Sequence, residues 1–145
     1  NYSSYEKSFV LNKLYLAFHN PVKDGGLVDA KTSAEIDSLR VRINQFNEIF
    51  LNIPNPDIDA LNDFAWNIYE LSDNPMLLNE AVRWSAKSVE LDRNWIYLDT
   101  YAALLFKVKR FKEAKPIAIE AYEKGYNELV YQRKRKEETH GKTKH

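Results

Sequence analysis

Three carboxylates near the middle of the chain, Asp57, Asp59 and Asp63, stand at spacings that a calcium-binding loop also uses. Such a loop needs a glycine at its sharp turn and a bidentate glutamate at its last position. Here Ile68 occupies that last position, and no glycine lies between it and Asp57. Carboxylates ahead of an apolar run are also typical of a helix N-terminus, whose partial positive charge favours them. We therefore interpret them as helix N-terminal residues and predict no metal site.

Histidine and cysteine, the residues most used for metal binding and nucleophilic catalysis, are scarce. The absence of cysteine excludes a disulfide, a thiolate metal site and a cysteine nucleophile within this chain. Glu137 and His140 form one Glu-x-x-His pair, whereas a carboxylate-bridged metal pair needs two such pairs. A hydrolytic triad around His19 would need a serine on a strand-turn-helix elbow, and no serine of this chain lies in such a pattern. Gly25-Gly26 lack the flanking residues of a phosphate-binding loop. We predict that the chain is not an enzyme, with no catalytic residues and no cofactor.

Charge is balanced over the chain, with 21 basic and 21 acidic residues and a formal net charge of zero. This balance produces no general attraction for nucleic acid, and no nucleic-acid partner is expected. The densest basic cluster, residues 133–136, is interpreted as a solvated chain end, with contact to phosphates or acidic lipid as the alternative. Apolar runs stay far below the roughly 20 residues of a spanning helix, so no transmembrane segment is expected.

The first half of the chain predicts two helices. Residues 5–18 lack the alternation of a strand and are expected to form a helix. The chain after Asn1 has no signal-like segment, so we expect a processed form or a piece of a longer protein. Thr32 and Glu35 match a capping box. The apolar residues that follow form one stripe: Ile36, Leu39, Ile43, Phe46 and Phe50. Intramolecular packing against the next helices is favoured, and a coiled-coil seam to another chain is the alternative.

A helical pattern then appears twice. The first copy has one apolar face on each of two helices, and the second copy repeats the arrangement with Asp92-Arg93-Asn94 as the turn between the copies. The residues of the first copy are Leu61, Phe64, Ala65, Ile68 and Leu71, then Leu77, Leu78, Ala81, Val82, Ser85 and Val89. Those of the second are Leu98, Tyr101, Ala102 and Leu105, then Phe111, Ala114, Ala118 and Ala121. Gly125 is predicted to stop the last of these helices.

These residues resemble a tetratricopeptide repeat, with Lys109-Arg110 in place of the usual turn glycine and about four extra residues around Asp73-Asn74-Pro75 that lengthen one loop. The segment from Leu61 to Gly125 also resembles the helical repeats that follow the thioredoxin-like domain of some bacterial proteins. The resemblance implies an all-α fold: a short right-handed stack of two hairpins (residues 57–128), preceded by packing helices (1–56) and followed by a terminal helix and basic tail (129–145). One structural domain is expected.

The tetratricopeptide resemblance also implies where a partner binds. Ligands of this family lie on the concave surface made by the first helix of each hairpin, which places six residues there: Asn62, Trp66, Tyr69, Asp99, Ala103 and Phe106. The alternative for Trp66 and Phe106 is structural packing against the terminal helices. The family's carboxylate clamp is not reproduced. The expected function is therefore a non-catalytic interaction module of a larger bacterial protein, with a protein or peptide partner. The alternative is a self-association domain that makes an attached enzyme a homo-oligomer. The compartment stays open between periplasm or secretion and cytoplasm.

Overall fold

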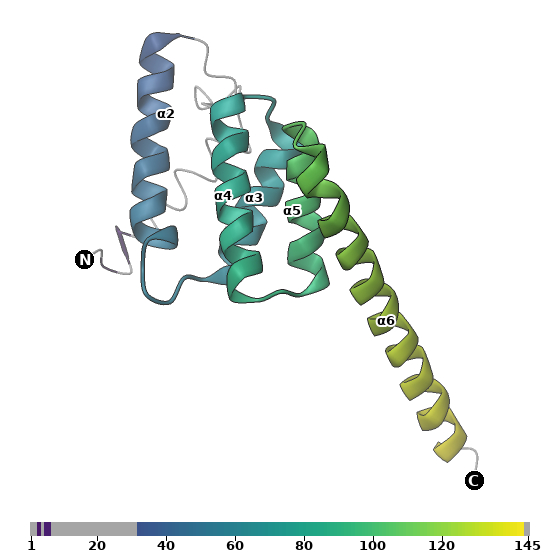
Figure 1. Cartoon of the computed structure of the whole chain (residues 1–145). Helices are drawn as coiled ribbons and strands as arrows, with labels where there is room; N and C mark the ends of the chain where they lie inside the picture. Colours follow the sequence, from purple (N-terminus) through teal and green to yellow (C-terminus); the bar gives the residue numbers. More distant parts are fainter. Residues whose placement is uncertain (1–2, 4, 7–31, 144–145) are drawn as a thin grey trace.

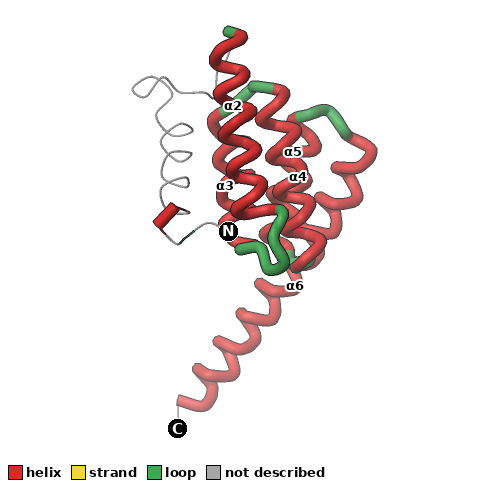
Figure 2. Tube along the Cα trace, turned by 90° about the vertical axis from the view of Figure 1, so that its left-hand side faces the viewer, coloured by secondary structure: helices red, strands yellow, loops and turns green. Residues whose placement is uncertain are grey.

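The computed structural model describes residues 3, 5–6 and 32–143, and all regular structure in this part of the chain is helical. Consecutive helices lie side by side, and the C-terminal part of the last one projects away from the others (Figure 1). Figure 2 shows the short loops that join them. The elements are α2 (Ser33–Phe46), a π-helical segment η2 (Asn47–Leu51), α3 (Ile58–Leu71), α4 (Pro75–Leu91), α5 (Trp95–Lys107) and α6 (Phe111–Thr143). The helix expected over residues 5–18 and His19 lie outside the described residues, apart from residues 5–6.

Each of the helices α2 to α5 begins at a side chain that caps its free backbone N–H groups. Thr32 Oγ1 accepts from the N–H of Glu35 at 3.1 Å, and Asp57 Oδ1 accepts from that of Ala60 at 3.1 Å, as predicted. Asn74 and Asn94 cap α4 and α5 in the same way, and Pro75 occupies the first position of α4. Removing such a cap typically costs about 1 kcal/mol. Local polar residues therefore determine where the helices start.

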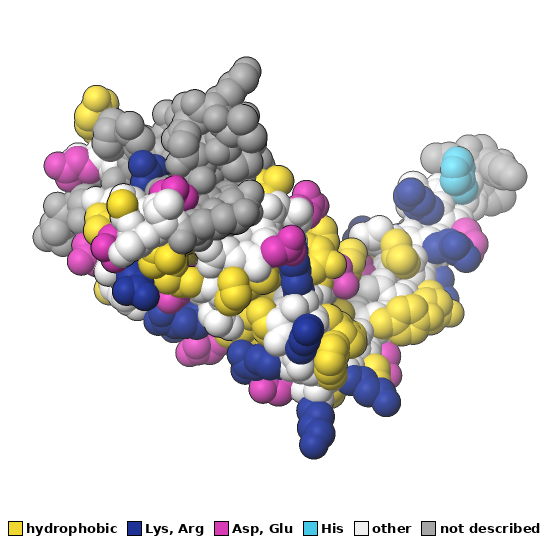
Figure 3. Space-filling model, turned by 90° about the horizontal axis from the view of Figure 1, so that it is seen from above, with side chains coloured by type: hydrophobic (Ala, Val, Ile, Leu, Met, Phe, Trp, Pro, Cys, Tyr) yellow, Lys and Arg dark blue, Asp and Glu magenta, His cyan; other side chains and the backbone are white. Residues whose placement is uncertain are grey.

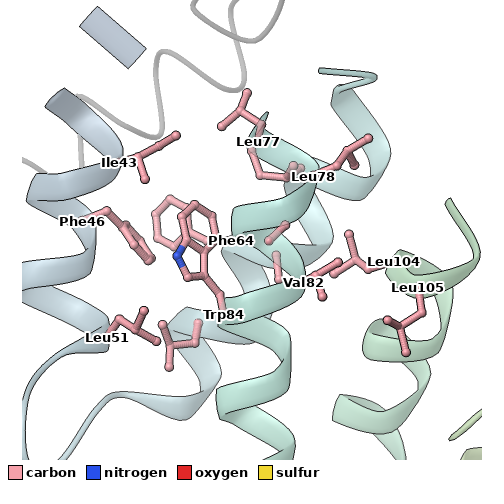
Figure 4. Packing of buried hydrophobic residues seen from close by; sticks show 14 of the residues in the cluster. Ile43, Phe46, Leu51, Phe64, Leu77, Leu78, Val82, Trp84, Leu104 and Leu105 are labelled. Atoms are coloured by element: carbon pink, nitrogen blue, oxygen red, sulfur yellow. The ribbon is translucent and has the colours of Figure 1, made fainter. Parts of the chain in front are cut away.

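The core lies where α2, α3 and α4 meet, and it is built around aromatic rings in edge-to-face and tilted contact. Phe46 of α2 contacts Phe64 of α3 and Trp84 of α4, with ring centroids 5.1 and 4.3 Å apart. Figure 4 shows these three rings pointing toward one another between the helices. The apolar stripe of α2 therefore packs inside the chain, and Leu39, Ile43 and Phe46 are all buried. It is not available as a seam to another chain.

One buried polar group supports this aromatic core. The indole N–H of Trp84 donates to Asn47 Oδ1 at 2.8 Å, and Asn47 Nδ2 donates to Glu80 Oε2 at 3.3 Å. Asn47 is the first residue of η2, where the helix widens after α2. Because an unpaired indole N–H in the core would be costly, this contact ties η2 to α4.

The two hairpins bury the apolar faces predicted from the repeated pattern. In the first, all the predicted residues of α4 and all those of α3 except Leu71 are buried. In the second, Leu98, Ala102, Leu105, Ala114 and Ala121 are buried, while Phe111 is 54% exposed. Small residues on α6 thus lie against α5 as expected.

Gly125 does not stop a helix. α6 runs without a break from Phe111 to Thr143 and passes through residues 128 and 129, where a separate terminal helix was expected. A Cβ atom on Gly125 would lie 3.3 Å from the Trp95 ring. The glycine therefore allows a close approach between α6 and the start of α5. The expectation that glycine ends a helix uses local sequence alone and does not include such a tertiary contact.

The long loop expected around residues 73–75 is also absent. The connections 72–74 and 108–110 both have three residues. They are equally long because α4 starts six residues before Ala81, whereas α6 starts only three residues before the corresponding Ala114. The extra residues of the first copy mainly form an added turn at the start of α4. In the second connection Lys109 has φ 66°, the left-handed conformation that glycine adopts most readily. No helix in the described part of the chain is both long and apolar enough to cross a membrane.

Candidate partner-binding surface

The first helices of the two hairpins, α3 and α5, contact each other directly and place part of the predicted surface in one pocket. This pocket has a volume of about 600 Å³ and is lined by Tyr69, Glu70, Ala103, Phe106 and Lys107. Tyr69 and Phe106 occupy corresponding positions in the two copies of the repeated pattern. The α3–α5 pocket therefore contains three of the six residues that the resemblance placed on the binding surface.

Trp66 extends this surface along α3. Its ring stacks on that of Tyr69, with centroids 4.9 Å apart and an angle of 25° between the ring planes. Both side chains are half-buried. On α5, the Phe106 side chain is 45% exposed, and its ring lies 6.0 Å from the ring of Phe111. Each aromatic residue of the pocket therefore has a further aromatic ring beside it, Trp66 next to Tyr69 and Phe111 next to Phe106.

The other two predicted residues are placed differently. Asn62 is only 7% exposed, and its Oδ1 atom has no hydrogen-bond partner within the described part of the chain. Asp99 is exposed on α5 but does not line the pocket. The repeated pattern places Asn62 and Asp99 on the same helix faces as the other four residues. Asn62, however, is buried and barely accessible to solvent.

Lys107 and Glu70 give the pocket a cation and an anion, and neither was predicted. The ammonium group of Lys107 donates to the backbone carbonyl of Tyr69 at 2.5 Å and lies 5.2 Å from the centre of the Tyr69 ring. Asp73 forms an ion pair with it at 3.5 Å. Lys107 thus joins α5 to α3. The repeated pattern did indicate Glu70 and Lys107, because they occupy corresponding positions in the two copies. Glu70 directly follows Tyr69, and Lys107 directly follows Phe106.

The carboxylates considered for a calcium loop have structural partners. Asp57 caps α3, and Asp59 accepts a hydrogen bond from the hydroxyl of Tyr97 on α5. Burial, together with the hydrogen bond to Asp59 and its charge, raises the pKa of Tyr97 to about 12. Burial and the charges of Asp59 and Asp57 raise the pKa of Asp63, which a hydrogen bond from Asn62 partly offsets. In the described residues no three His, Asp or Glu side chains are grouped to hold a metal ion.

Comparisons of this chain with protein-family models, with curated proteins and with solved structures found no match. The tetratricopeptide resemblance therefore depends on the residues of the repeated pattern alone. The all-helical architecture and the α3–α5 pocket are the structural observations from which a function can be argued.

Proposed function

We propose that this chain is a non-catalytic protein-interaction module whose partner binds along α3 and α5. The observation that carries the proposal is the α3–α5 pocket, in which Tyr69, Ala103 and Phe106 come together from corresponding helices of two hairpins. Surfaces built from corresponding residues of stacked hairpins are the usual binding surfaces of helical-repeat proteins. The right-handed tetratricopeptide-type stack and the attachment to a larger, thioredoxin-like bacterial protein are parts of the same proposal, and the residue patterns support them.

The chemistry of the pocket indicates a peptide segment as the ligand. Exposed aromatic rings are the residues that most often contribute binding energy at protein interfaces. Tyr69 and Phe106 can contact an apolar side chain, while Glu70 and Lys107 can orient polar groups next to it. Lys107 is already held by Tyr69 and Asp73, so its position is fixed before a ligand arrives.

Self-association through the stripe of α2 receives no support, because Leu39, Ile43 and Phe46 are buried within the chain. Light scattering coupled to size-exclusion chromatography tests whether the chain self-associates at all. A stable dimer that persists on dilution would favour a self-association domain over the interaction module, with the contact on a surface other than the α2 stripe.

The proposal is tested by selecting peptides that bind the purified chain from a random peptide library displayed on phage. We expect selected peptides whose affinity falls about tenfold or more when Phe106 or Tyr69 is replaced by Ala. Tyr131→Ala is the matched control, because this aromatic residue is also exposed but lies on α6. Circular dichroism verifies that the variants stay helical. Selected peptides that all bind Phe106→Ala and Tyr69→Ala as tightly as the unmodified chain would contradict the proposal.

A further inference from the structure

The last helix has a second apolar face that the described part of the chain leaves exposed. One face of α6 packs on α5 through Ala114, Ala121 and Gly125. A different face presents four large side chains at alternating spacings of three and four residues. We name it the α6 stripe: Ile119, Tyr122, Tyr126 and Leu129, which are 49%, 72%, 57% and 64% exposed. Figure 3 shows hydrophobic side chains exposed along the projecting part of the molecule, next to Lys and Arg.

The corresponding face of the first hairpin is covered by a helix. Ala81 of α4 corresponds to Ala114 of α6, and the same register pairs Val89 with Tyr122. Val82 and Val89 are 4% and 5% exposed, because they face α5. Figure 4 shows Val82 beside Leu104 of α5. Tyr122 of the α6 stripe thus occupies the position at which the preceding hairpin receives its next helix.

Positive charge continues the α6 stripe at both ends. Lys115 precedes Ile119 by four residues, and Arg133 and Lys136 follow Leu129 at the same alternating spacing. None of these three cations forms an ion pair with another described residue, whereas Glu113, Glu120 and Lys124 on other sides of α6 are paired. Glu123 lies along its edge, and Glu137, four residues after Arg133, lies on the same face and offsets one of the two cations at that end. A ligand of this face would therefore meet apolar surface flanked by net positive charge.

This charge distribution disfavours a second copy of the chain as the occupant. If two α6 helices packed antiparallel about the centre of the stripe, Lys115 would lie opposite Arg133 of the other copy. If they packed parallel, every cation would lie opposite itself. Like charges in such positions are destabilising.

We propose that the α6 stripe binds an amphipathic helix of another protein, with apolar residues at its centre and Asp or Glu near both ends. The ligand helix would lie against α6 as α5 lies against α4. Its acidic residues would pair with Lys115 at one end and with Arg133 and Lys136 at the other. This site is distinct from the α3–α5 pocket and does not depend on it.

The test uses two synthetic amphipathic helices of about 20 residues, long enough to have helical character alone. Both carry leucines at the spacing of the α6 stripe, one with Glu and the other with Lys near its ends. Fluorescence anisotropy of the labelled peptides measures binding to the full chain. We expect binding of the Glu peptide that weakens as salt is added, and binding of the Lys peptide at least about tenfold weaker.

Variants locate the site. The double substitution Tyr122→Ser with Leu129→Ser should weaken binding of the Glu peptide about tenfold or more. Tyr131→Ser, a change at a 56% exposed residue on another side of α6, should leave it unchanged. Phe106→Ala in the α3–α5 pocket should also leave it unchanged. Arg133→Glu should reduce the preference for the Glu peptide.

Four results would overturn the proposal. Equal binding of the Glu and Lys peptides would refute the role of charge, and loss of binding in Phe106→Ala would move the site to the α3–α5 pocket. Binding to vesicles that contain phosphatidylserine, without binding of the Glu peptide, would identify a bilayer surface as the ligand. A dimer that dissociates in the double variant would identify a second copy of the chain.

Discussion

At the scale of single residues, an ion-pair cluster joins the turn before α5 to α6. Arg93 donates two hydrogen bonds to the Glu120 carboxylate, both at 2.7 Å, and Lys124 lies 2.9 Å from the same carboxylate. Lys124 also donates to the backbone carbonyl of Arg93 at 2.8 Å. The hydrogen bonds from Arg93 and Lys124 lower the pKa of Glu120 to about 2. A bidentate pair of this kind fixes orientation as well as adding energy.

This cluster predicts a pH-dependent contribution to stability. A carboxylate whose pKa is lowered in the folded state stabilises it above the unfolded pKa, and the contribution disappears as the pH falls through the folded pKa. Glu120→Gln should therefore lower the free energy of unfolding at pH 7, by at most about 1 kcal/mol because solvent screens the pair. The difference from the unmodified chain should shrink between pH 4.5 and about pH 2.

Urea unfolding at several pH values measures this difference. Glu123→Gln, an exposed change on the same helix, serves as the control. A difference for Glu120→Gln that stays constant from pH 7 to pH 2 would show that the ion pairs are not its cause.

At the scale of elements, α6 is one continuous helix whose contact with α5 depends on small residues. Ala114 and Ala121 are buried, and Gly125 lies against the ring of Trp95. Gly141 lies in the same helix, where an added Cβ atom would meet no neighbouring atom within 4 Å. The two glycines therefore have different surroundings within one element.

Replacing each glycine with leucine distinguishes a packing contact from a helix end. Gly125→Leu should destabilise the chain by about 1 to 3 kcal/mol, because the added side chain overpacks the contact with Trp95. Gly141→Leu should leave the melting temperature unchanged or slightly higher, since leucine favours helix more than glycine does. Thermal unfolding followed by circular dichroism measures both. Equal effects of the two substitutions would contradict the contact.

At the scale of the whole molecule, the buried apolar residues form a connected core. Its main cluster extends from Leu39 and Phe46 on α2 to Leu104 on α5 and Ala114 on α6. Helices that share one core are expected to unfold together. The α2 helix should therefore contribute to the stability of elements that it does not touch.

Phe46→Ala tests this cooperativity. Removing the ring from its contacts with Phe64 and Trp84 should cost about 3 to 5 kcal/mol. Circular dichroism and tryptophan fluorescence should both report a single, lowered transition. Val41→Ala, an exposed change on α2, should have little effect. Two separate transitions in the variant would show that α2 and the hairpins unfold independently.

The sequence by itself determined local features: where α2 and α3 begin, most of the buried helix faces, and that the described residues are helical. Thr32 and Asp57 act on backbone groups within three residues, and apolar spacing reports burial of one helix face, so no knowledge of distant residues is needed. The six surface residues came from the tetratricopeptide resemblance, and three of them, Tyr69, Ala103 and Phe106, share one pocket.

The tertiary structure alone decided features that depend on residues far apart in the chain. Gly125 looked like a helix end, but its environment depends on Trp95, and the role of Asn47 depends on Trp84. Lys107 reaches Tyr69 only because α3 and α5 lie side by side. These contacts form when helices pack against one another. Which helix faces meet depends on packing between helices rather than on the periodicity within one of them.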